Sequence, residues 1–363
     1  MLPEKICSRS SPSNIAGLRM SNDERFMRTA LAEARKAFGQ TSPNPAVGAI
    51  LVANNRIIAR GHHRQAGQPH AEIECLRKIR GKIPKNSTLY VTLEPCSTKG
   101  RTSACTEQIK RSGVQTVVIG ATDPNPQHRG RGIEILREAG IEVRSGVLAE
   151  ECAHLNEAFN KWIATGIPFV TAKCGMSLDG RLTRSKKESR WVTSAAARRH
   201  AHTLRAQTDA ILIGATTLRI DNPQLTARGH GKIRQPKRVV LTRSGKLPRN
   251  AHFFKDRLAK NSFVYRDLPL AAVLADLGQK DVTSVMIEGG GNILGHALDE
   301  RLIDKVQIYI APIFTGGSVV AFGGRGAPKT SDGAHLERVR FEKIGPDICL
   351  IGYPKYGSTV AAE

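Results

Sequence analysis

The sequence predicts an α/β protein made of two consecutive domains. Short apolar segments typical of strands alternate with helical segments along most of the 363 residues. This order favours sheets that are largely parallel and covered by helices. A break at Thr165-Gly166-Ile167-Pro168 divides the alternation into two series. No apolar run approaches the ~20 residues that a membrane-spanning helix needs.

The composition excludes several classes of protein. Hydrophobic residues make up 40% and charged residues 24% of the chain, which is ordinary for a globular protein and excludes a disordered or fibrous one. Seven cysteines are too few for a disulfide scaffold and suit a reducing compartment, so we expect a cytoplasmic location. The net charge of +23 favours anionic partners such as phosphorylated small molecules, but a general solubility adaptation explains it equally well.

The N-terminal residues 1–20 lack hydrophobic periodicity and an apolar segment typical of a secretory signal. We expect them to be a disordered or misannotated extension, with Met20 as an alternative start. Ser21 and Glu24 have the spacing of a capping box, so the first domain is expected to begin at Ser21. The predicted domains are residues 21–165 and 166–363.

The elements of the first domain follow from apolar spacing and turn residues. The capping box opens a helix over 23–38, and Asn54-Asn55 separates two strands over 46–52 and 56–60. The remaining expected helices are 71–80, 103–112, 130–139 and 151–164, and the remaining strands are 88–93, 115–120 and 141–143.

The second domain repeats the alternation after the Gly-Ile-Pro break. Its expected strands are 169–174, 209–213, 237–241, 262–265, 283–287 and 305–311. Helices are expected over 194–206, 216–220 and 293–301, and the basic stretch 228–236 is expected to be a loop.

The strongest chemical signal is His70-Ala71-Glu72, followed by Cys96 and Cys105. One imidazole and two thiolates are suitable ligands for a tetrahedral zinc ion that keeps its fourth position for water, and zinc lowers the pKa of that water toward ~7. A carboxylate beside the ligands, here Glu72, can then move protons. A structural zinc site, or side chains packed without a metal, are the alternatives.

The H-x-E and P-C patterns are typical of zinc deaminases that act on cytosine-like or adenine-like rings. Here the cysteines are nine residues apart instead of three, and the chain adds the motifs Pro43-Asn44-Pro45 and Asp123-Pro-Asn-Pro126. This set resembles the deaminase domain of the bifunctional riboflavin-biosynthesis deaminase–reductases. The resemblance implies a three-layer, cytidine-deaminase-like fold. It also implies these roles: zinc ligands at His70, Cys96 and Cys105, a proton shuttle at Glu72, a pyrimidine contact at Asn44 and a phosphate contact at Arg101.

The chain departs from this pattern at two places. Thr98 stands where many relatives have His, and Ser103-Ala104 stands where they have Pro-Pro. The first departure concerns a substrate contact and leaves the metal ligands unchanged.

The second half lacks a G-x-G-x-x-G turn after a strand, but Glu288-Gly-Gly-Gly-Asn-Ile-Leu-Gly295 follows an expected strand and opens a helix. Such a turn lets a phosphate approach the backbone. Together with Lys173–Arg181, Trp191–Ser194, Leu204-Arg205 and Asp221–Arg228, it resembles the reductase domain of the same family, which has a dihydrofolate-reductase-like α/β fold.

This second resemblance implies two groups of binding residues. NADPH is expected at Gly175, Trp191, Thr217, Asp221, Gly290, Gly291, Asn292, Ile293, Leu294, Gly295 and His296. The phosphosugar is expected at Ser189, Arg205, Leu225, Arg228 and Glu288. Asp221 is the expected proton donor, with Lys173 as the alternative. From the residues alone, each Arg is equally compatible with a solvated surface charge and Asp221 with an Asx turn.

Together these features predict a bifunctional enzyme of riboflavin biosynthesis. We expect zinc-dependent hydrolytic deamination of 2,5-diamino-6-ribosylamino-4(3H)-pyrimidinone 5-phosphate, then NADPH-dependent reduction of the ribosyl chain to ribityl. The alternatives are a nucleic-acid base deaminase with a basic binding domain and a basic RNA-binding protein. The nine-residue cysteine spacing argues against the first, and the aromatic content of 5% argues against the second. We expect no nucleic-acid or membrane partner, and a homo-oligomer formed through the second domain.

Overall fold

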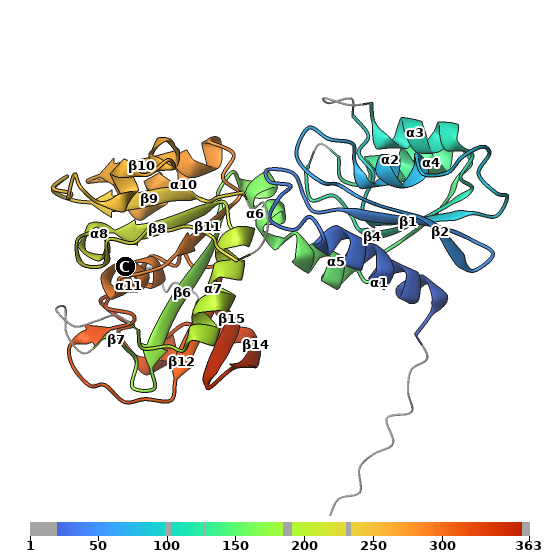
Figure 1. Ribbon diagram of the computed structural model, residues 1–363. Coiled ribbons are helices and arrows are strands. Elements are labelled where there is room, and N and C mark those ends of the chain that lie inside the picture. Colours follow the sequence, from blue (N-terminus) through green and yellow to red (C-terminus); the bar gives the residue numbers. More distant parts are fainter. Residues whose placement is uncertain (1–19, 99–102, 127, 184–190, 230–233, 358–363) are drawn as a thin grey trace, which may run out of the picture.

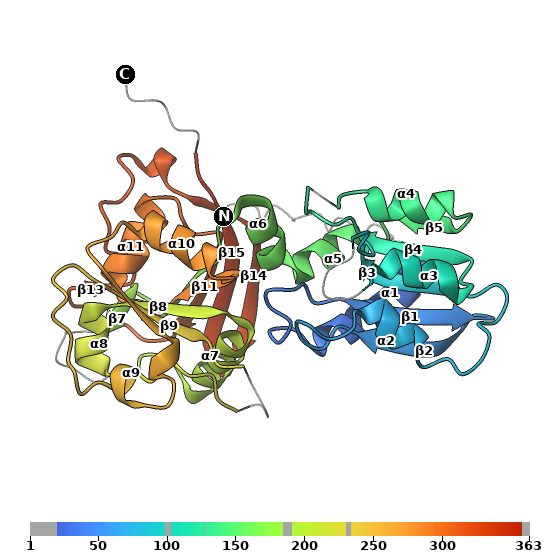
Figure 2. The ribbon, with the colours of Figure 1, turned by 90° about the horizontal axis from the view of Figure 1, so that it is seen from above.

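The computed structural model describes residues 20–98, 103–126, 128–183, 191–229 and 234–357. Two α/β lobes lie on either side of helix α6 (Glu157–Thr165), as Figures 1 and 2 show. The expected extension lies outside the described residues apart from Met20. The expected order of two α/β units is confirmed, and the domain boundary near residue 166 stays a prediction.

The first lobe is a five-stranded sheet between two layers of helices (Figure 1). The sheet order is β2-β1-β3-β4-β5. Strand β1 runs antiparallel to β2 and β3, whereas β3, β4 and β5 run parallel. The elements are α1 (Asn22–Arg35), β1 (Gly48–Ala53), β2 (Arg56–His62), α2 (Ala71–Leu76), β3 (Thr88–Leu93), α3 (Cys105–Ser112), β4 (Thr116–Ala121), α4 (Arg131–Glu138), β5 (Glu142–Ser145) and α5 (Ala149–Leu155).

Alternation along β1 explains the three layers. Ala49 and Leu51 belong to a buried cluster with residues of α2, α3 and α4. Ile50 and Val52 belong to a second cluster with residues of α1 and α5. Successive side chains of a strand point to opposite faces, so both faces of this sheet are covered. The predicted capping box at Ser21 is confirmed, since its hydroxyl and the Glu24 carboxylate each accept a backbone N–H.

The second lobe contains one eight-stranded sheet, ordered β10-β9-β8-β11-β6-β12-β15-β14. The first six strands run parallel, β15 runs antiparallel to β12, and β14 runs antiparallel to β15. The elements are β6 (Phe169–Ser177), β7 (Arg181–Thr183), α7 (Ala195–Gln207), β8 (Ala210–Gly214), α8 (Ala215–Asp221), β9 (Lys237–Thr242), α9 (His252–Lys255), β10 (Ser262–Arg266), α10 (Leu270–Gln279), β11 (Ser284–Ile287), α11 (Gly291–Asp299), β12 (Lys305–Ala311), β13 (Val319–Val320), β14 (His335–Ile344) and β15 (Asp347–Lys355).

Several elements differ from the expectation. Strand β15, the short strands β7 and β13 and helix α9 were not expected. Helix α2 ends at Leu76, although a helix was expected to extend to residue 80. The helix expected over 151–164 is divided into α5 and α6 at Asn156, whose buried side chain exchanges two hydrogen bonds with the backbone of Ala46. Helix α10 was not expected, although its buried residues recur at helical spacing. Strand β14 also was not expected, because its mostly exposed side chains give no apolar alternation. Among the described helices, none combines the length and apolarity needed to cross a membrane.

Candidate active sites

The first candidate site lies where a strand end and two helix N-termini meet. His70 is the N-cap of α2, Cys105 begins α3, and Cys96 follows β3. His70 Nδ1 lies 3.1 Å from Cys105 Sγ and 3.6 Å from Cys96 Sγ, and the three ligand atoms lie within 4.8 Å of one another. Tetrahedral zinc, with bonds of ~2.1 Å to nitrogen and ~2.3 Å to sulfur, would separate its donors by roughly 3.5–3.8 Å. The three residues therefore fit zinc.

The same residues favour a thiolate before any metal binds. The hydrogen bond with Cys105, supported by His70, lowers the pKa of Cys96 despite its burial. The Cys105 thiol is the partner of Cys96 in that hydrogen bond, and this bond together with burial raises the pKa of Cys105. A structural zinc site needs a fourth protein ligand, and within the described part of the chain the cluster of ligand atoms has three members. The set therefore matches a site with one open position.

Glu72 lies in the first turn of α2, two residues after His70, and is 3% exposed. Burial raises the pKa of Glu72, and the nearby imidazole of His70 opposes that shift only in part. A carboxyl group in this environment can carry a proton at a higher pH than an exposed one. Glu72 therefore lies where a proton shuttle for this site is expected.

Asn44 is held beside the metal ligands by His63, a residue that the sequence analysis did not single out. Asn44 Nδ2 lies 3.1 Å from His63 Nε2, and His63 Nδ1 lies 3.0 Å from the carbonyl oxygen of Pro69. Burial lowers the pKa of His63, which favours a neutral ring that donates to Pro69 and accepts from Asn44. The His63 ring stands edge-on to His70, with 5.3 Å between the ring centres.

Glu94 ties the Asp123-Pro-Asn-Pro126 segment to the strand end that precedes Cys96. Its buried carboxylate accepts backbone N–H groups of Asp123 at 3.1 Å, Gly130 at 3.0 Å and Gly132 at 2.8 Å. This arrangement brings His128 against the loop after Cys96. His128 lies 3.4 Å from Ser97 Oγ and 3.5 Å from Thr98 Oγ1. Sequence spacing alone gave no signal for His128, and Arg101 lies outside the described residues.

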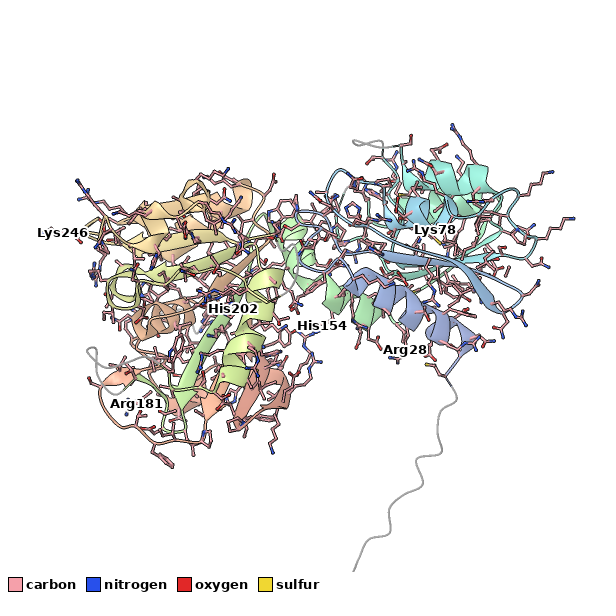
Figure 3. All side chains as sticks on the ribbon, viewed as in Figure 1. Arg28, Lys78, His154, Arg181, His202 and Lys246 are labelled. Atoms are coloured by element: carbon pink, nitrogen blue, oxygen red, sulfur yellow. The ribbon has the colours of Figure 1, made fainter. Side chains whose placement is uncertain are left out.

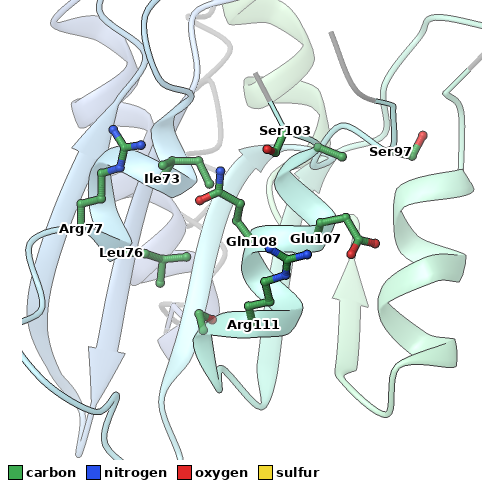
Figure 4. Close-up of a pocket in the computed structure, with 10 residues that line it drawn as sticks. Ile73, Leu76, Arg77, Ser97, Ser103, Glu107, Gln108 and Arg111 are labelled. Carbon is green, nitrogen blue, oxygen red and sulfur yellow. The ribbon is translucent and has the colours of Figure 1, made fainter. Parts of the chain in front are cut away.

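A cavity of about 660 Å³ borders this site between α2 and α3 (Figure 4). Ser97 and Ala104, neighbours of Cys96 and Cys105 in sequence, line it together with Arg77 and Arg111. Neither the ligand residues nor Glu72 belongs to this lining. The cavity therefore lies beside the metal site and is not its interior.

The second candidate site lies at the carboxyl end of β11, where parallel sheets commonly bind ligands. Arg205 on α7 donates from Nε to Glu288 Oε1 at 2.8 Å and from a terminal nitrogen to Oε2 at 2.5 Å. Burial would raise the pKa of Glu288, but Arg205 and Lys173 lower it to about 2. Both Arg205 and His202 donate to the Thr226 carbonyl at 3.1 Å, and Figure 3 shows His202 within this lobe.

The glycine turn after Glu288 brings two expected cofactor residues together. Gly290 is the N-cap of α11, and a Cβ atom there would lie 3.3 Å from Thr217 Oγ1. The N-terminus of α11 therefore faces the start of α8. A Cβ atom at Gly175 on β6 would lie 2.9 Å from the Thr193 methyl group, so the strand and the segment after Trp191 are in close contact.

The other expected residues of this lobe are more dispersed. Trp191 is 68% exposed beneath the Arg198 guanidinium. Leu225 and Leu294 are packed in buried clusters, Gly295 packs against 323–324, and His296 pairs with Glu300 on the helix surface. Gly291 and Asn292 lie against residues 320–323, and Ile293 contacts Gly214. The exposed Arg228 donates hydrogen bonds to the side chains of Gln224 and Thr226. Asp221 is the last residue of α8. Ser189 lies outside the described residues. The assigned roles of all these residues stay predictions.

Comparison with known proteins covers both lobes. Residues 20–121 match the zinc-binding region of cytidine and deoxycytidylate deaminases, and residues 168–350 match the RibD C-terminal domain. The riboflavin biosynthesis protein RibD of Synechocystis sp. is 39% identical, with 92% of this chain and 97% of the relative covered. RibD of Bacillus amyloliquefaciens is 37% identical with the same coverage.

Solved structures agree. RibD of Acinetobacter baumannii superimposes with a TM-score of 0.86 at 35% identity, over 92% of this chain and 99% of that one. A diaminohydroxyphosphoribosylaminopyrimidine deaminase/5-amino-6-(5-phosphoribosylamino)uracil reductase from Thermotoga maritima gives 0.83 at 34% identity with the same coverage. These matches confirm the expected resemblance and the fold class, a cytidine-deaminase-like domain followed by a RibD-type reductase domain. This chain therefore belongs to the RibD family of riboflavin biosynthesis proteins.

Proposed function

We propose that this protein catalyses two consecutive reactions of riboflavin biosynthesis. Its first lobe removes the 2-amino group of 2,5-diamino-6-ribosylamino-4(3H)-pyrimidinone 5-phosphate as ammonia, and its second lobe reduces the ribosyl chain of the product to ribityl with NADPH. The observation that carries the proposal is the convergence of His70, Cys96 and Cys105 beside buried Glu72. The name of the Thermotoga maritima relative supports the two substrates.

For deamination, His70, Cys96 and Cys105 would hold zinc. The chemistry that zinc supplies in such a site is polarisation of a water molecule, which lowers the pKa of that water toward ~7. Glu72 accepts a proton from the attacking water on its carboxylate and delivers it to the departing amine. The buried position of Glu72, two residues after His70, supports this double role.

Asn44 orients the pyrimidine. Its Nδ2 donates to His63, which leaves Oδ1 to accept an N–H group of the ring. The His63 tautomer is fixed in turn by its hydrogen bond to Pro69. At the phosphate end of the substrate we assign a contact to His128, whose ring lies beside Thr98, the position at which many relatives carry a histidine. Arg101 remains the second expected phosphate contact.

In the second lobe, the glycine turn and the α11 N-terminus offer backbone N–H groups to the phosphates of NADPH. The cofactor supplies the hydride. The paired Arg205 and Glu288, with exposed Arg228, form the polar wall for the phosphosugar. Asp221 stays our first candidate for the proton donor and Lys173 the second. Lys173 is close enough to Glu288 to lower the pKa of that carboxyl, so D221N and K173Q variants separate the two assignments.

The two-step proposal is tested by the order of events in the purified protein. We expect one zinc per chain and ammonia release from the diaminopyrimidine ribotide before any NADPH oxidation. H70A should lose zinc and ammonia release together, yet still oxidise NADPH when given the deaminated ribotide. Ammonia release from single-stranded RNA or DNA, with none from the ribotide, would instead establish the alternative, a nucleic-acid base deaminase.

A homo-oligomer formed through the second lobe is a further part of the proposal. Strand β14 ends the sheet in the described part of the chain, so one edge of its backbone has no neighbouring strand there. It exposes Val339 and Phe341, and the adjacent β15 exposes Ile348. An uncovered edge with apolar side chains is a common site of subunit association. Light scattering of the wild type and F341E tests this assignment. The thiolate ligands and the use of NADPH suit a cytoplasmic location.

A further inference from the structure

The loop that precedes Asn44 is seated on the second lobe. Gly39 has a φ of +82°, and a Cβ atom there would lie 2.6 Å from the Ala206 carbonyl oxygen and 2.7 Å from Gln207 Cα. Both contacts are with backbone at the end of α7, so any side chain at position 39 would force the lobes apart. Three residues later, Ser42 Oγ donates to Asp209 Oδ2 at 2.7 Å.

Asp209 is fixed by its own lobe. Its carboxylate is 3% exposed and accepts both the backbone N–H and the hydroxyl of Thr283, at 2.7 Å and 2.8 Å. Arg234 forms an ion pair with the other carboxylate oxygen. Arg234 also reaches the first lobe, donating from its backbone to the Gln40 side chain at 3.3 Å and from Nε to the Gly39 carbonyl at 3.5 Å. Asp209 and Arg234 thus anchor the 39–42 loop to the second lobe.

The loop continues directly into the deamination site. The Asn44 backbone N–H donates to the Thr41 carbonyl at 3.0 Å, which closes a turn on the anchored residues. On the other side of Asn44, buried Asn156 holds the backbone of Ala46 through two hydrogen bonds. Hydrogen bonds therefore fix the chain on both sides of Asn44, at Ser42 and at Ala46. The Asn44 side chain contacts His63, whose ring lies beside that of His70.

We propose that Asp209 and Arg234, both in the second lobe, are positioning residues for deamination in the first. They hold the 39–42 loop so that Asn44 presents its amide to the pyrimidine. This inference rests on the proposed deaminase function. A group that orients the bound substrate contributes to its binding, so displacement of that group by the loss of a distant anchor should be measurable as a rise in KM.

The test compares S42A and R234A in the full-length protein. Each removes polar contacts at a partly exposed position and leaves the zinc ligands, Glu72 and Asn44 in place. We expect the KM for the diaminopyrimidine ribotide to rise about 3–10-fold with kcat changed less than about 2-fold, because binding orientation is affected and proton transfer is not. S42T keeps the hydroxyl and should restore the wild-type KM. Zinc content and NADPH-dependent reduction of the deaminated ribotide should not change.

The matched control is Y353F at a second contact between the lobes. There the Tyr353 hydroxyl donates to Glu157 at 2.7 Å near His154, which Figure 3 places at the junction. Y353F also removes polar contacts across the junction, those of the hydroxyl with Glu157 and His154, but lies outside the 39–46 segment, so its KM should equal that of the wild type.

Two results would overturn the inference. One is a wild-type KM in both S42A and R234A; the other is a rise in Y353F equal to theirs, which would indicate general loosening of the junction. The double variant S42A/N44A adds a further check, since it should be no weaker than N44A. Failure of the proposed function would look different, because no variant and no wild-type sample would then release ammonia.

Discussion

The two candidate sites are assembled in different ways. The candidate zinc ligands and the candidate proton shuttle of the first site lie between residues 70 and 105, on consecutive elements. The three candidate ligand atoms lie within 4.8 Å of one another. Expected residues of the second site extend from 173 to 296 over several strands and helices, and its largely buried Arg205 is paired with Glu288. A metal site needs a few side-chain atoms at fixed points, whereas a cofactor cleft is built largely from backbone. We therefore expect a single substitution in the first site to affect mainly the activity of its lobe. We expect a single substitution in the second site to affect the stability of its lobe as well.

The largest effect on activity is expected for Glu72→Gln. The amide keeps the shape of the side chain but cannot transfer the proton, so kcat for deamination should fall about 10²–10⁴-fold. Zinc content and reductase activity should remain as in the wild type. The control is E74Q on the same helix, where the Glu74 carboxylate forms an ion pair with Arg64 at 3.2 Å. Retention of ammonia release in E72Q, measured under single-turnover conditions, would remove Glu72 from the mechanism.

Arg205→Ala is expected to act on the second lobe alone. It leaves the buried Glu288 carboxylate without its bidentate partner, and breaking such a pair costs about 3–5 kcal/mol. Urea unfolding followed by tryptophan fluorescence reports on this region, because Trp162 lies in α6 with its indole bonded to Gly278 and Trp191 precedes α7. NADPH-dependent turnover should be lost while folded protein still releases ammonia.

The double variant R205M/E288L is the control for that experiment. Removing both charges leaves no unpaired ion, so most of the lost free energy of unfolding should return although reduction stays absent. If R205A unfolds at the wild-type urea concentration, the pair contributes nothing to stability and the comparison drawn above fails for the second lobe.

The pH dependence of unfolding is a second test of the Arg205–Glu288 pair. Arg205 and Lys173 overcome burial and lower the pKa of Glu288 from 4.5 to about 2. A carboxyl whose pKa is lower in the folded state stabilises the protein fully above its unfolded pKa. That stabilisation is lost as the pH falls from about 4.5 toward about 2. The free energy of unfolding should therefore drop over this window in the wild type and drop less in R205M/E288L. Equal slopes in both proteins would contradict the lowered pKa.

How far the sequence predicts each site follows from the range of the interactions. The meeting of His70, Cys96 and Cys105 could be predicted because short motifs after β3 and at the N-termini of α2 and α3 carry these residues. Their roles, and that of Glu72, stay predictions. Ser42 and Asp209 could not be paired, since 167 residues separate them and both are ordinary polar residues. Asn156 shows the same limit, because a contact with Ala46, 110 residues away, interrupts a helix that local apolar spacing predicts as continuous. Helix α10 differs, since its apolar spacing was visible in the sequence.

The smallest predicted effect concerns His128, which lies 3.5 Å from Thr98 and is assigned to the substrate phosphate. H128A removes one hydrogen-bonding group, which contributes roughly 0.5–1.5 kcal/mol, so the KM for deamination should rise about 2–10-fold with kcat unchanged. The decisive variant is T98H/H128A, which moves the imidazole from position 128 to position 98, the neighbouring residue in this contact. If a phosphate contact explains the role of His128, the double variant regains the KM of the wild type. A deaminated substrate analogue that lacks the phosphate should inhibit the wild type and H128A equally. If H128A weakens the binding of the substrate and of the phosphate-free analogue to the same extent, His128 instead acts by holding the loop after Cys96.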